Sequence, residues 1–248
     1  MPKVSIITPL FNGAGFIEET IRSVLNQTFT DWEMIIVDDC SGDHPEAIIS
    51  RYADRDARIR LIRLEQNHGA AAARNVAMDL ACGDYIAFLD GDDTWKPAKL
   101  QRQVGLMESN NWTFSFTAYE TVKQDGTPTG KIVRVPKKID YRTYLKNTVI
   151  GCLTVMIDRR HTGPFKMPLI RTSHDMALWL DLMKRGFAAH GIDEVLASYR
   201  LVSSSNTANK LKAAKGVWHV YREIEKLALF PSLSNFAGYL FHAVKKRI

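Results

Sequence analysis

The sequence predicts an α/β protein built on a mainly parallel sheet flanked by helices, and three observations support this prediction. Short apolar segments rich in Val and Ile alternate with helix-like segments through the first hundred or so residues. These apolar segments are hydrophobic on both faces, as expected for strands that helices cover on both sides. Acidic residues directly follow two of the segments, at the edge where open α/β sheets bind ligands.

The first half of the chain is expected to alternate strands and helices. The predicted strands are residues 4–10, 32–37, 58–64 and 85–89, and the predicted helices are residues 16–27, 47–52, 70–82 and 99–108. Such alternation is typical of right-handed βαβ units and a parallel sheet.

The alternation of predicted strands and helices becomes less regular after Trp95. We expect strands at residues 113–122, 153–157 and 192–199, a turn at 124–128 and a helix at 175–185. Without a linker, repeat or low-complexity segment, residues 1–209 are predicted to form one domain. Its halves are residues 1–108 and a divergent 109–209, and a basic helical tail follows at 210–248.

Composition and charge narrow the function classes. The chain is 46% apolar and 24% charged, as in ordinary soluble globular proteins. Its three cysteines form no CxxC pair, which argues against a disulfide framework or zinc site and fits a reducing cytosol. We expect no signal peptide, no membrane span and a cytoplasmic location. The net charge of +6 resides in the tail, so the body is neutral and nucleic acid is not an expected partner.

The fourth predicted strand ends in three carboxylates around one glycine, at Asp90, Gly91, Asp92 and Asp93. Clustered carboxylates repel one another, and a hard divalent metal such as Mg²⁺ or Mn²⁺ is the simplest way to neutralise them. The alternative is a solvated acidic turn that caps the helix beginning near Lys96. The four residues alone do not decide between these interpretations.

Neighbouring segments of the sequence favour the metal site over the solvated turn. Asp38 and Asp39 end the second strand, and Gly69 opens a helix whose N-terminus attracts anions. A phosphate-bearing ligand could lie between the metal and this helix, where Arg74 would reach the ligand or pair with Asp39. The loop after the first strand lacks the third glycine of G-x-G-x-x-G, and the chain has no P-loop. A metal-bridged diphosphate is therefore the better account.

Four segments in the same order and spacing carry a family resemblance: VSIITPLFN, IRSVLNQTFTDWEMIIVDDCSGD, NHGAAAARN and GDYIAFLDGDDTWKPAKL. They resemble the signature of family 2 glycosyltransferases with the GT-A fold, over about residues 3–108. Residues 151–158 (GCLTVMID) more narrowly resemble teichuronic-acid-type, cell-surface polysaccharide glycosyltransferases. The resemblance implies a Rossmann-like sheet, a nucleotide-sugar half at 1–108 and an acceptor half at 109–209.

The resemblance also implies roles for residues of the first half. Thr8, Pro9 and Phe11 would line the base of a UDP-sugar, with Phe11 where the family often has Tyr. Asp39 would accept a hydrogen bond from uracil N3. The triplet 90–92 would be the DxD motif, with Asp90 near the ribose and Asp92 on an Mn²⁺ or Mg²⁺ ion that bridges the diphosphate; Asp90 is the second candidate ligand.

In the acceptor half, the resemblance assigns the general base of an inverting transfer to Asp175. Its alternative role is that of a carboxylate stabilised at a helix N-terminus. His174 replaces the usual acidic neighbour and is expected to be structural. Val202 stands where a histidine could complete the metal shell, before serines at 203–205, and Arg200 is then assigned to the diphosphate. The absence of a QxxRW-like motif implies transfer of a single sugar.

The implied acceptor is a glycan or lipid-linked glycan. Residues 227–244 are uncharged and precede Lys245-Lys246-Arg247, a pattern that fits a peripheral contact with the anionic inner face of the membrane. Packing of this segment on the domain is the alternative. A sugar nucleotidyltransferase would need basic residues in the loop LFNGAG, which has none. A non-catalytic nucleotide-sugar-binding module stays open.

Overall fold

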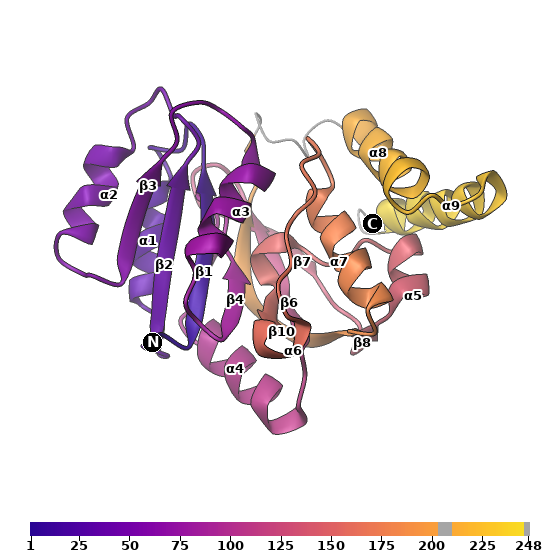
Figure 1. The fold of residues 1–248 in the computed structure, drawn as a ribbon, viewed down its shortest axis with the longest axis horizontal. Helices are drawn as coiled ribbons and strands as arrows, with labels where there is room; N and C mark the ends of the chain where they lie inside the picture. Colours follow the sequence, from indigo (N-terminus) through magenta and orange to yellow (C-terminus); the bar gives the residue numbers. More distant parts are fainter. Residues whose placement is uncertain (203–209, 246–248) are drawn as a thin grey trace.

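The structure, a computed structural model, describes residues 1–202 and 210–245. Within these residues ten strands form one sheet, with helices packed on both faces (Figure 1). The main strand order is β3-β2-β1-β4-β9-β6-β10-β5, with β7 beside β6 and β8 beside β10. The predicted α/β class is confirmed.

The first half follows the predicted alternation, with differences of a few residues at element ends. Its elements are β1 (Val4–Leu10), α1 (Ile17–Leu25), β2 (Trp32–Asp38), α2 (Glu46–Ala53), β3 (Ile59–Arg63), α3 (Ala70–Leu80), β4 (Tyr85–Phe88), β5 (Thr94–Trp95) and α4 (Lys99–Asn110). Strands β3, β2, β1 and β4 are parallel neighbours in that order. Their carboxyl ends therefore meet at one edge of the sheet.

The second half departs further from expectation. Its elements are β6 (Phe114–Val122), β7 (Pro128–Val133), β8 (Lys138–Ile139), α5 (Tyr141–Lys146), η1 (Cys152–Thr154), β9 (Met156–Asp158), α6 (Arg159–Thr162), α7 (His174–Lys184) and β10 (Ala189–Arg200). The strand predicted at 153–157 was wrong at its start, because residues 152–154 form a 3₁₀ turn. Strand β9 then runs antiparallel to both β4 and β6.

Two apolar clusters fill the two faces of the sheet. Helices α3, α5 and α7 contribute to one cluster, and α1, α2 and α4 contribute to the other. Trp179 of α7 is fully buried, with its ring 5.4 Å from Phe88 of β4 and 5.3 Å from Phe114 of β6. This contact fixes α7 against the strand that leads into Asp90.

The tail consists of α8 (Lys210–His219), the π-helical η2 (Val220–Ile224) and α9 (Leu229–Lys245). Tyr221 is fully buried and its hydroxyl donates to the carbonyl of Leu145, while the Tyr141 hydroxyl donates to Glu225 at 2.6 Å. The tail therefore packs on α5 and α7, and α9 runs beside α5 (Figure 1). Pro231 is tolerated because it lies in the first turn of α9.

No helix among residues 1–202 and 210–245 is long and apolar enough to cross a membrane. The expected boundary at residue 209, the serines at 203–205 and the basic residues Lys246 and Arg247 lie outside the described residues.

Candidate functional site

The carboxyl ends of β1 and β2 are joined into one preformed edge. The Asp39 N–H donates to the Leu10 carbonyl at 2.8 Å. Beyond it, the Asn12 N–H donates to the Ser41 hydroxyl at 2.9 Å, and the Gly42 N–H donates to the Asn12 side-chain oxygen at 2.9 Å. The loops after the two strands therefore hold each other in place.

Asp38 and Asp39 are both buried at this edge. Asp38 accepts from the Ser41 N–H at 3.1 Å and from the Ser41 hydroxyl. Asp39 accepts from the N–H groups of His68 and Gly69 at 2.8 and 2.7 Å. Gly69 has a φ of 89°, a conformation that favours glycine, and it directly precedes α3. The helix start expected to receive a ligand phosphate is thus occupied in part by a carboxylate of the protein.

Helix α1 holds the turn of residues 90–93 through hydrogen bonds. The Asp93 N–H donates to the Asp90 carbonyl at 3.1 Å, and the Thr20 hydroxyl donates to the carbonyls of Gly91 and Asp93 at 3.1 and 2.8 Å. A Cβ on Gly91 would lie 2.5 Å from Leu10 Cδ1, which explains the glycine between the carboxylates. The turn is therefore rigidly placed at the end of β4.

Arg200, at the end of β10, supports the same turn from the other side. It is 3% exposed, and its N–H donates to Asp93 Oδ1 at 2.8 Å. Its guanidinium donates to the carbonyls of Asp92 and Gln124, each at 2.8 Å, and to the Glu19 carboxylate at 2.5 Å. All three guanidinium nitrogens donate to the protein itself, so Arg200 holds the turn in place; its contact with a diphosphate stays a prediction.

Asp93 does not fit the alternative of a solvated, helix-capping turn, since it is 1% exposed and does not cap α4. Burial, together with Asp92 and Asp90, raises its pKa well above the ordinary value. Burial and then Asp90 raise the pKa of Asp92 to about 6. The turn thus concentrates carboxylates whose charge the surrounding groups do not fully neutralise.

These carboxylates fit a hard divalent cation, because their donors are oxygens and because burial and the neighbouring carboxylates both disfavour their charge in the absence of a cation. No three His, Cys, Asp or Glu side chains converge into a complete metal site in the described part of the chain. The protein would therefore supply one or two carboxylates, and a ligand such as a diphosphate would supply the others.

Arg74 of α3 links the turn to α7. It is 4% exposed, pairs with the Asp90 carboxylate, and its second terminal nitrogen lies 2.6 Å from His174 Nε2. Because Arg74 can only donate, His174 accepts at Nε2 and directs Nδ1–H to the Ile170 carbonyl at 3.3 Å. The alternative pairing of Arg74 with Asp39 is wrong.

The pKa values agree with this arrangement. Burial lowers the pKa of the Arg74 guanidinium, but Asp90, Cys152 and Asp175 together more than offset burial and raise it. Burial and the Arg74 charge lower the pKa of His174, so the imidazole is neutral at neutral pH. The expectation that His174 is a satisfied structural histidine agrees with these contacts.

Asp175 lies in the first turn of α7, partly exposed and within electrostatic range of Arg74 and His174. No described residue donates a hydrogen bond to its carboxylate. The contact of Trp179 with β4 fixes the helix one turn further on. Asp175 is therefore a rigidly placed carboxylate with unused acceptor capacity. It lies in electrostatic range of Arg74, which pairs with Asp90 of the turn.

The three residues expected around a base differ in accessibility. Phe11 is 53% exposed and can present its ring to a ligand, whereas Thr8 and Pro9 lie inside β1 and are buried. The Thr8 hydroxyl is buried without a hydrogen-bond partner. Any contact of Thr8 or Pro9 with a base would therefore come from the end of β1, and the prediction that these residues line a base stays a prediction.

Several residues around the site were not predicted from the sequence. Thr20 and Glu19 of α1 hold the turn and Arg200, and Cys152 of η1 lies in the electrostatic environment of Arg74. Burial raises the pKa of the Cys152 thiol well above its ordinary value. The residues around Cys152 form no pattern that would predict its position near Arg74.

Comparisons with known proteins agree with this geometry. The family model described as glycosyl transferase family 2 matches residues 5–161. The chain is 52% identical over 247 residues to TuaG of Bacillus subtilis (strain 168), a glycosyltransferase named for teichuronic acid biosynthesis, covering 100% of this chain and 98% of the relative. It is 40% identical over 244 residues to WfgD of Escherichia coli, a UDP-Glc:α-D-GlcNAc-diphosphoundecaprenol β-1,3-glucosyltransferase, covering 98% and 94%.

Solved structures share the fold. TarS residues 1–349 of S. aureus in complex with UDP-GlcNAc superimpose with a TM-score of 0.72 at 18% identity, covering 96% of this chain and 71% of that one. The mannosyltransferase PcManGT of Pyrobaculum calidifontis, in complex with GDP-Man and Mn²⁺, gives a TM-score of 0.72 at 17% identity, covering 99% and 71%. The chain has a GT-A-like fold and belongs to glycosyl transferase family 2.

Proposed function

We propose that this glycosyltransferase transfers one sugar, with inversion, from a UDP-sugar to a hydroxyl of a lipid-linked glycan in cell-surface polysaccharide biosynthesis. The names of the relatives TuaG and WfgD support the process and the lipid-linked acceptor. The UDP-GlcNAc complex of the structural neighbour TarS supports the nucleotide.

The observation that carries the proposal is the connection between the two halves of the site. The Asp90–Arg74–His174 chain joins the carboxylate turn of β4 to the start of α7, where the Asp175 carboxylate has no donor from the described residues. Asp175 takes the proton of the acceptor hydroxyl, whose oxygen attacks the anomeric carbon as the bond to UDP breaks. This hydrogen-bonded chain supports a reaction in which the two halves of the site act together.

On the donor side, the exposed Phe11 ring stacks on the base and Asp39 accepts from uracil. The two N–H groups that Asp39 already binds fix its orientation. Asp92, with the Asp90 oxygen that does not face Arg74, would hold Mn²⁺ or Mg²⁺. When bound, the metal supplies Lewis-acid stabilisation of the charge that develops on the departing diphosphate. Arg200 acts indirectly, by holding the Asp92 carbonyl.

A thermal-shift screen of UDP-sugars with and without Mn²⁺ tests the donor proposal. We expect one UDP-sugar to raise the Tm with Mn²⁺ and much less without it, because ligands that bind the folded state stabilise it by mass action. Asp92→Asn should remove the metal-dependent part of the Tm shift. Asp31→Asn, which changes the exposed residue directly before β2, should retain this part. If no UDP-sugar gives a metal-dependent shift, the proposal is wrong.

The same experiment has an expected pH dependence. The pKa of Asp92 is raised to about 6, so protonation of this carboxyl favours the folded state. This contribution to stability is complete below pH 3.8, the ordinary pKa, and is lost as the pH rises through about 6. Mn²⁺ needs the ionised form, so its affinity should fall about tenfold per pH unit below 6. Equal Mn²⁺ affinity at pH 5 and pH 7.5 would contradict the assignment of Asp92.

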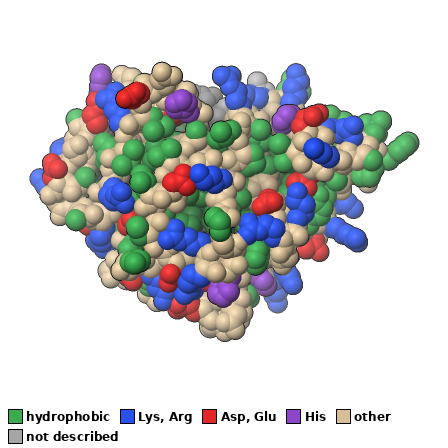
Figure 2. Space-filling view, in the orientation of Figure 1, with side chains coloured by type: hydrophobic (Ala, Val, Ile, Leu, Met, Phe, Trp, Pro, Cys, Tyr) green, Lys and Arg blue, Asp and Glu red, His purple; other side chains and the backbone are tan. Residues whose placement is uncertain are grey.

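We also propose that α9 rests on the anionic inner face of the membrane, which would make this a cytoplasmic, peripheral enzyme. Large apolar side chains on one side of α9 are about half or more exposed: Leu229, Phe230, Leu233, Leu240 and Phe241. Figure 2 shows hydrophobic side chains gathered at the projecting end of the tail, with Lys and Arg side chains nearby. An exposed apolar helix face beside basic residues suits a lipid interface.

Co-sedimentation with phosphatidylglycerol vesicles tests this contact. Phe230→Ser should weaken binding by about tenfold or more, because a buried Phe ring contributes roughly 1.5–3 kcal/mol. Ile132→Ser, at an exposed position on β7, is the control and should bind as the wild type does. Unchanged binding of the Phe230 variant would argue against a membrane role for α9.

A further inference from the structure

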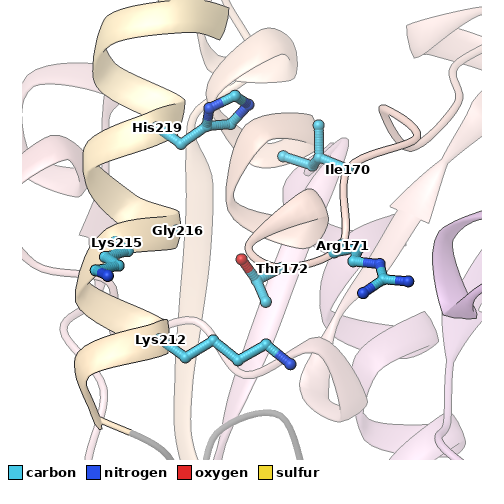
Figure 3. A pocket seen from close by; sticks show the side chains of 7 residues that line it. All are labelled: Ile170, Arg171, Thr172, Lys212, Lys215, Gly216 and His219. Atoms are coloured by element: carbon cyan, nitrogen blue, oxygen red, sulfur yellow. The ribbon is translucent and has the colours of Figure 1, made fainter.

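An open cavity of about 330 Å³ lies between α8 and the segment that leads into α7 (Figure 3). Its lining residues are Ile170, Arg171, Thr172, Lys212, Lys215, Gly216 and His219. Three of them carry a permanent positive charge and none is acidic. Lys212 and His219 extend from α8 toward the Ile170–Thr172 segment (Figure 3). Such a lining favours an anion with several oxygens.

The cavity adjoins the proposed general base. A Cβ on Gly216 would lie 2.5 Å from Thr172 Oγ1 and 2.8 Å from Ser173 Oγ, so the backbone of α8 touches the residues just before α7. Asp175 is in the first turn of that helix. The lining residues Arg171 and Thr172 therefore precede by four and three residues the aspartate that would activate the acceptor hydroxyl.

A second open cavity, of about 520 Å³, continues along the other side of α8 and shares Lys215 and His219 with the first. Its other lining residues are apolar (Leu211, Ala214, Trp218 and Phe236) or charged (Arg222 and Glu223). The Trp218 and Phe236 rings lie 5.4 Å apart, which joins α8 to α9. The order of environments is thus the Asp175 carboxylate, a basic cavity and a second cavity whose apolar part includes Phe236 of α9.

We infer that the basic cavity binds the diphosphate that joins the acceptor's sugar to its lipid, and that the apolar part of the second cavity takes the first part of the hydrocarbon chain. This inference rests on the proposed function, because it orders the parts of an acceptor around Asp175. Phosphate groups of bulk membrane lipids share the same chemistry. The position of the cavity beside the general base favours the acceptor's own diphosphate.

The test compares two acceptors that carry the same sugar, a GlcNAc-diphospho-alkyl lipid and a neutral alkyl α-GlcNAc glycoside. For Arg171→Gln/Lys215→Gln, KM for the diphosphate acceptor should rise about 30- to 100-fold, because each lost charge-assisted hydrogen bond weakens binding roughly tenfold. KM for the neutral glycoside and for the UDP-sugar should stay within about twofold. The control Lys131→Gln/Lys137→Gln removes the same charge from the β7–β8 segment and should change neither value.

Equal changes with both acceptors, or no change with either, would overturn the inference. Direct calorimetric binding of the two glycosides keeps the test independent of catalysis. If the wild type transfers no sugar but binds the diphosphate glycoside in a manner that requires Arg171 and Lys215, the proposed function fails and the cavity assignment holds. If soluble dihexanoyl-phosphatidylglycerol binds as tightly and with the same residue dependence, the cavity serves membrane lipid headgroups and the inference is wrong.

Discussion

Asp175→Asn is expected to lower kcat by about 10³-fold while leaving the affinity for the UDP-sugar and Mn²⁺ within about twofold. A general base contributes roughly 10²–10⁴-fold to a rate, and the amide that replaces the carboxylate is similar in size but cannot take a proton. The donor side should be unaffected, because no described residue depends on Asp175 for a hydrogen bond. Single-turnover rates and donor binding measured on the same preparation separate the two effects.

Asp181→Asn is the matched control, since Asp181 is an exposed carboxylate on the same helix. Its kcat should match the wild-type value. If Asp175 only stabilises the start of α7, the Asn variant should lose about 0.3–1 kcal/mol of stability and keep its rate. An unchanged rate would therefore remove Asp175 from the mechanism. Lost transfer with retained UDP-sugar affinity would distinguish a catalyst from a nucleotide-sugar-binding module.

Much of the nucleotide half could be predicted from the sequence because its signals are local. An apolar strand followed at once by carboxylates fixes both the strand and the sheet edge that the carboxylates reach, as for Asp39 and Asp90. A glycine before an alanine-rich helix likewise marked the start of α3 at Gly69. These features depend on neighbours in sequence, and the parallel order β2-β1-β4 then brings them together.

The partners of the site residues could not be predicted, because they come from distant parts of the chain. Arg200 and Asp92 are 108 residues apart, and Arg74 and His174 are 100 residues apart. No local pattern states which acceptor a buried arginine will find. The missed strand β7 has a different cause: it is a mostly exposed edge strand that begins with Pro128, so it lacks the apolar alternation by which strands are identified.

Arg200→Met is expected to lower the free energy of unfolding by about 3–5 kcal/mol, the usual cost of removing one partner from a buried charged network. The variant loses the donors to the carbonyls of Asp92 and Gln124 and leaves Asp93 buried without the nearby positive charge. Arg200→Lys should recover part of the stability, because it restores the charge but not the planar arrangement of donors. Urea unfolding of the three proteins measures the differences.

Glu19→Gln is the control that shows which contact of Arg200 contributes the stability. Glu19 is 57% exposed, so its ion pair with Arg200 should contribute no more than about 1 kcal/mol. If the loss in Arg200→Met is as small as in Glu19→Gln, the contact with Glu19 accounts for it and the bonds to the turn are not important for stability. If the loss is large and the Mn²⁺-dependent shift disappears with it, Arg200 holds Asp92 in the position that the metal requires. The carboxylate turn then depends on β10 as well as on the strand that precedes it, since Arg200 holds the Asp92 carbonyl while the Thr20 hydroxyl holds those of Gly91 and Asp93.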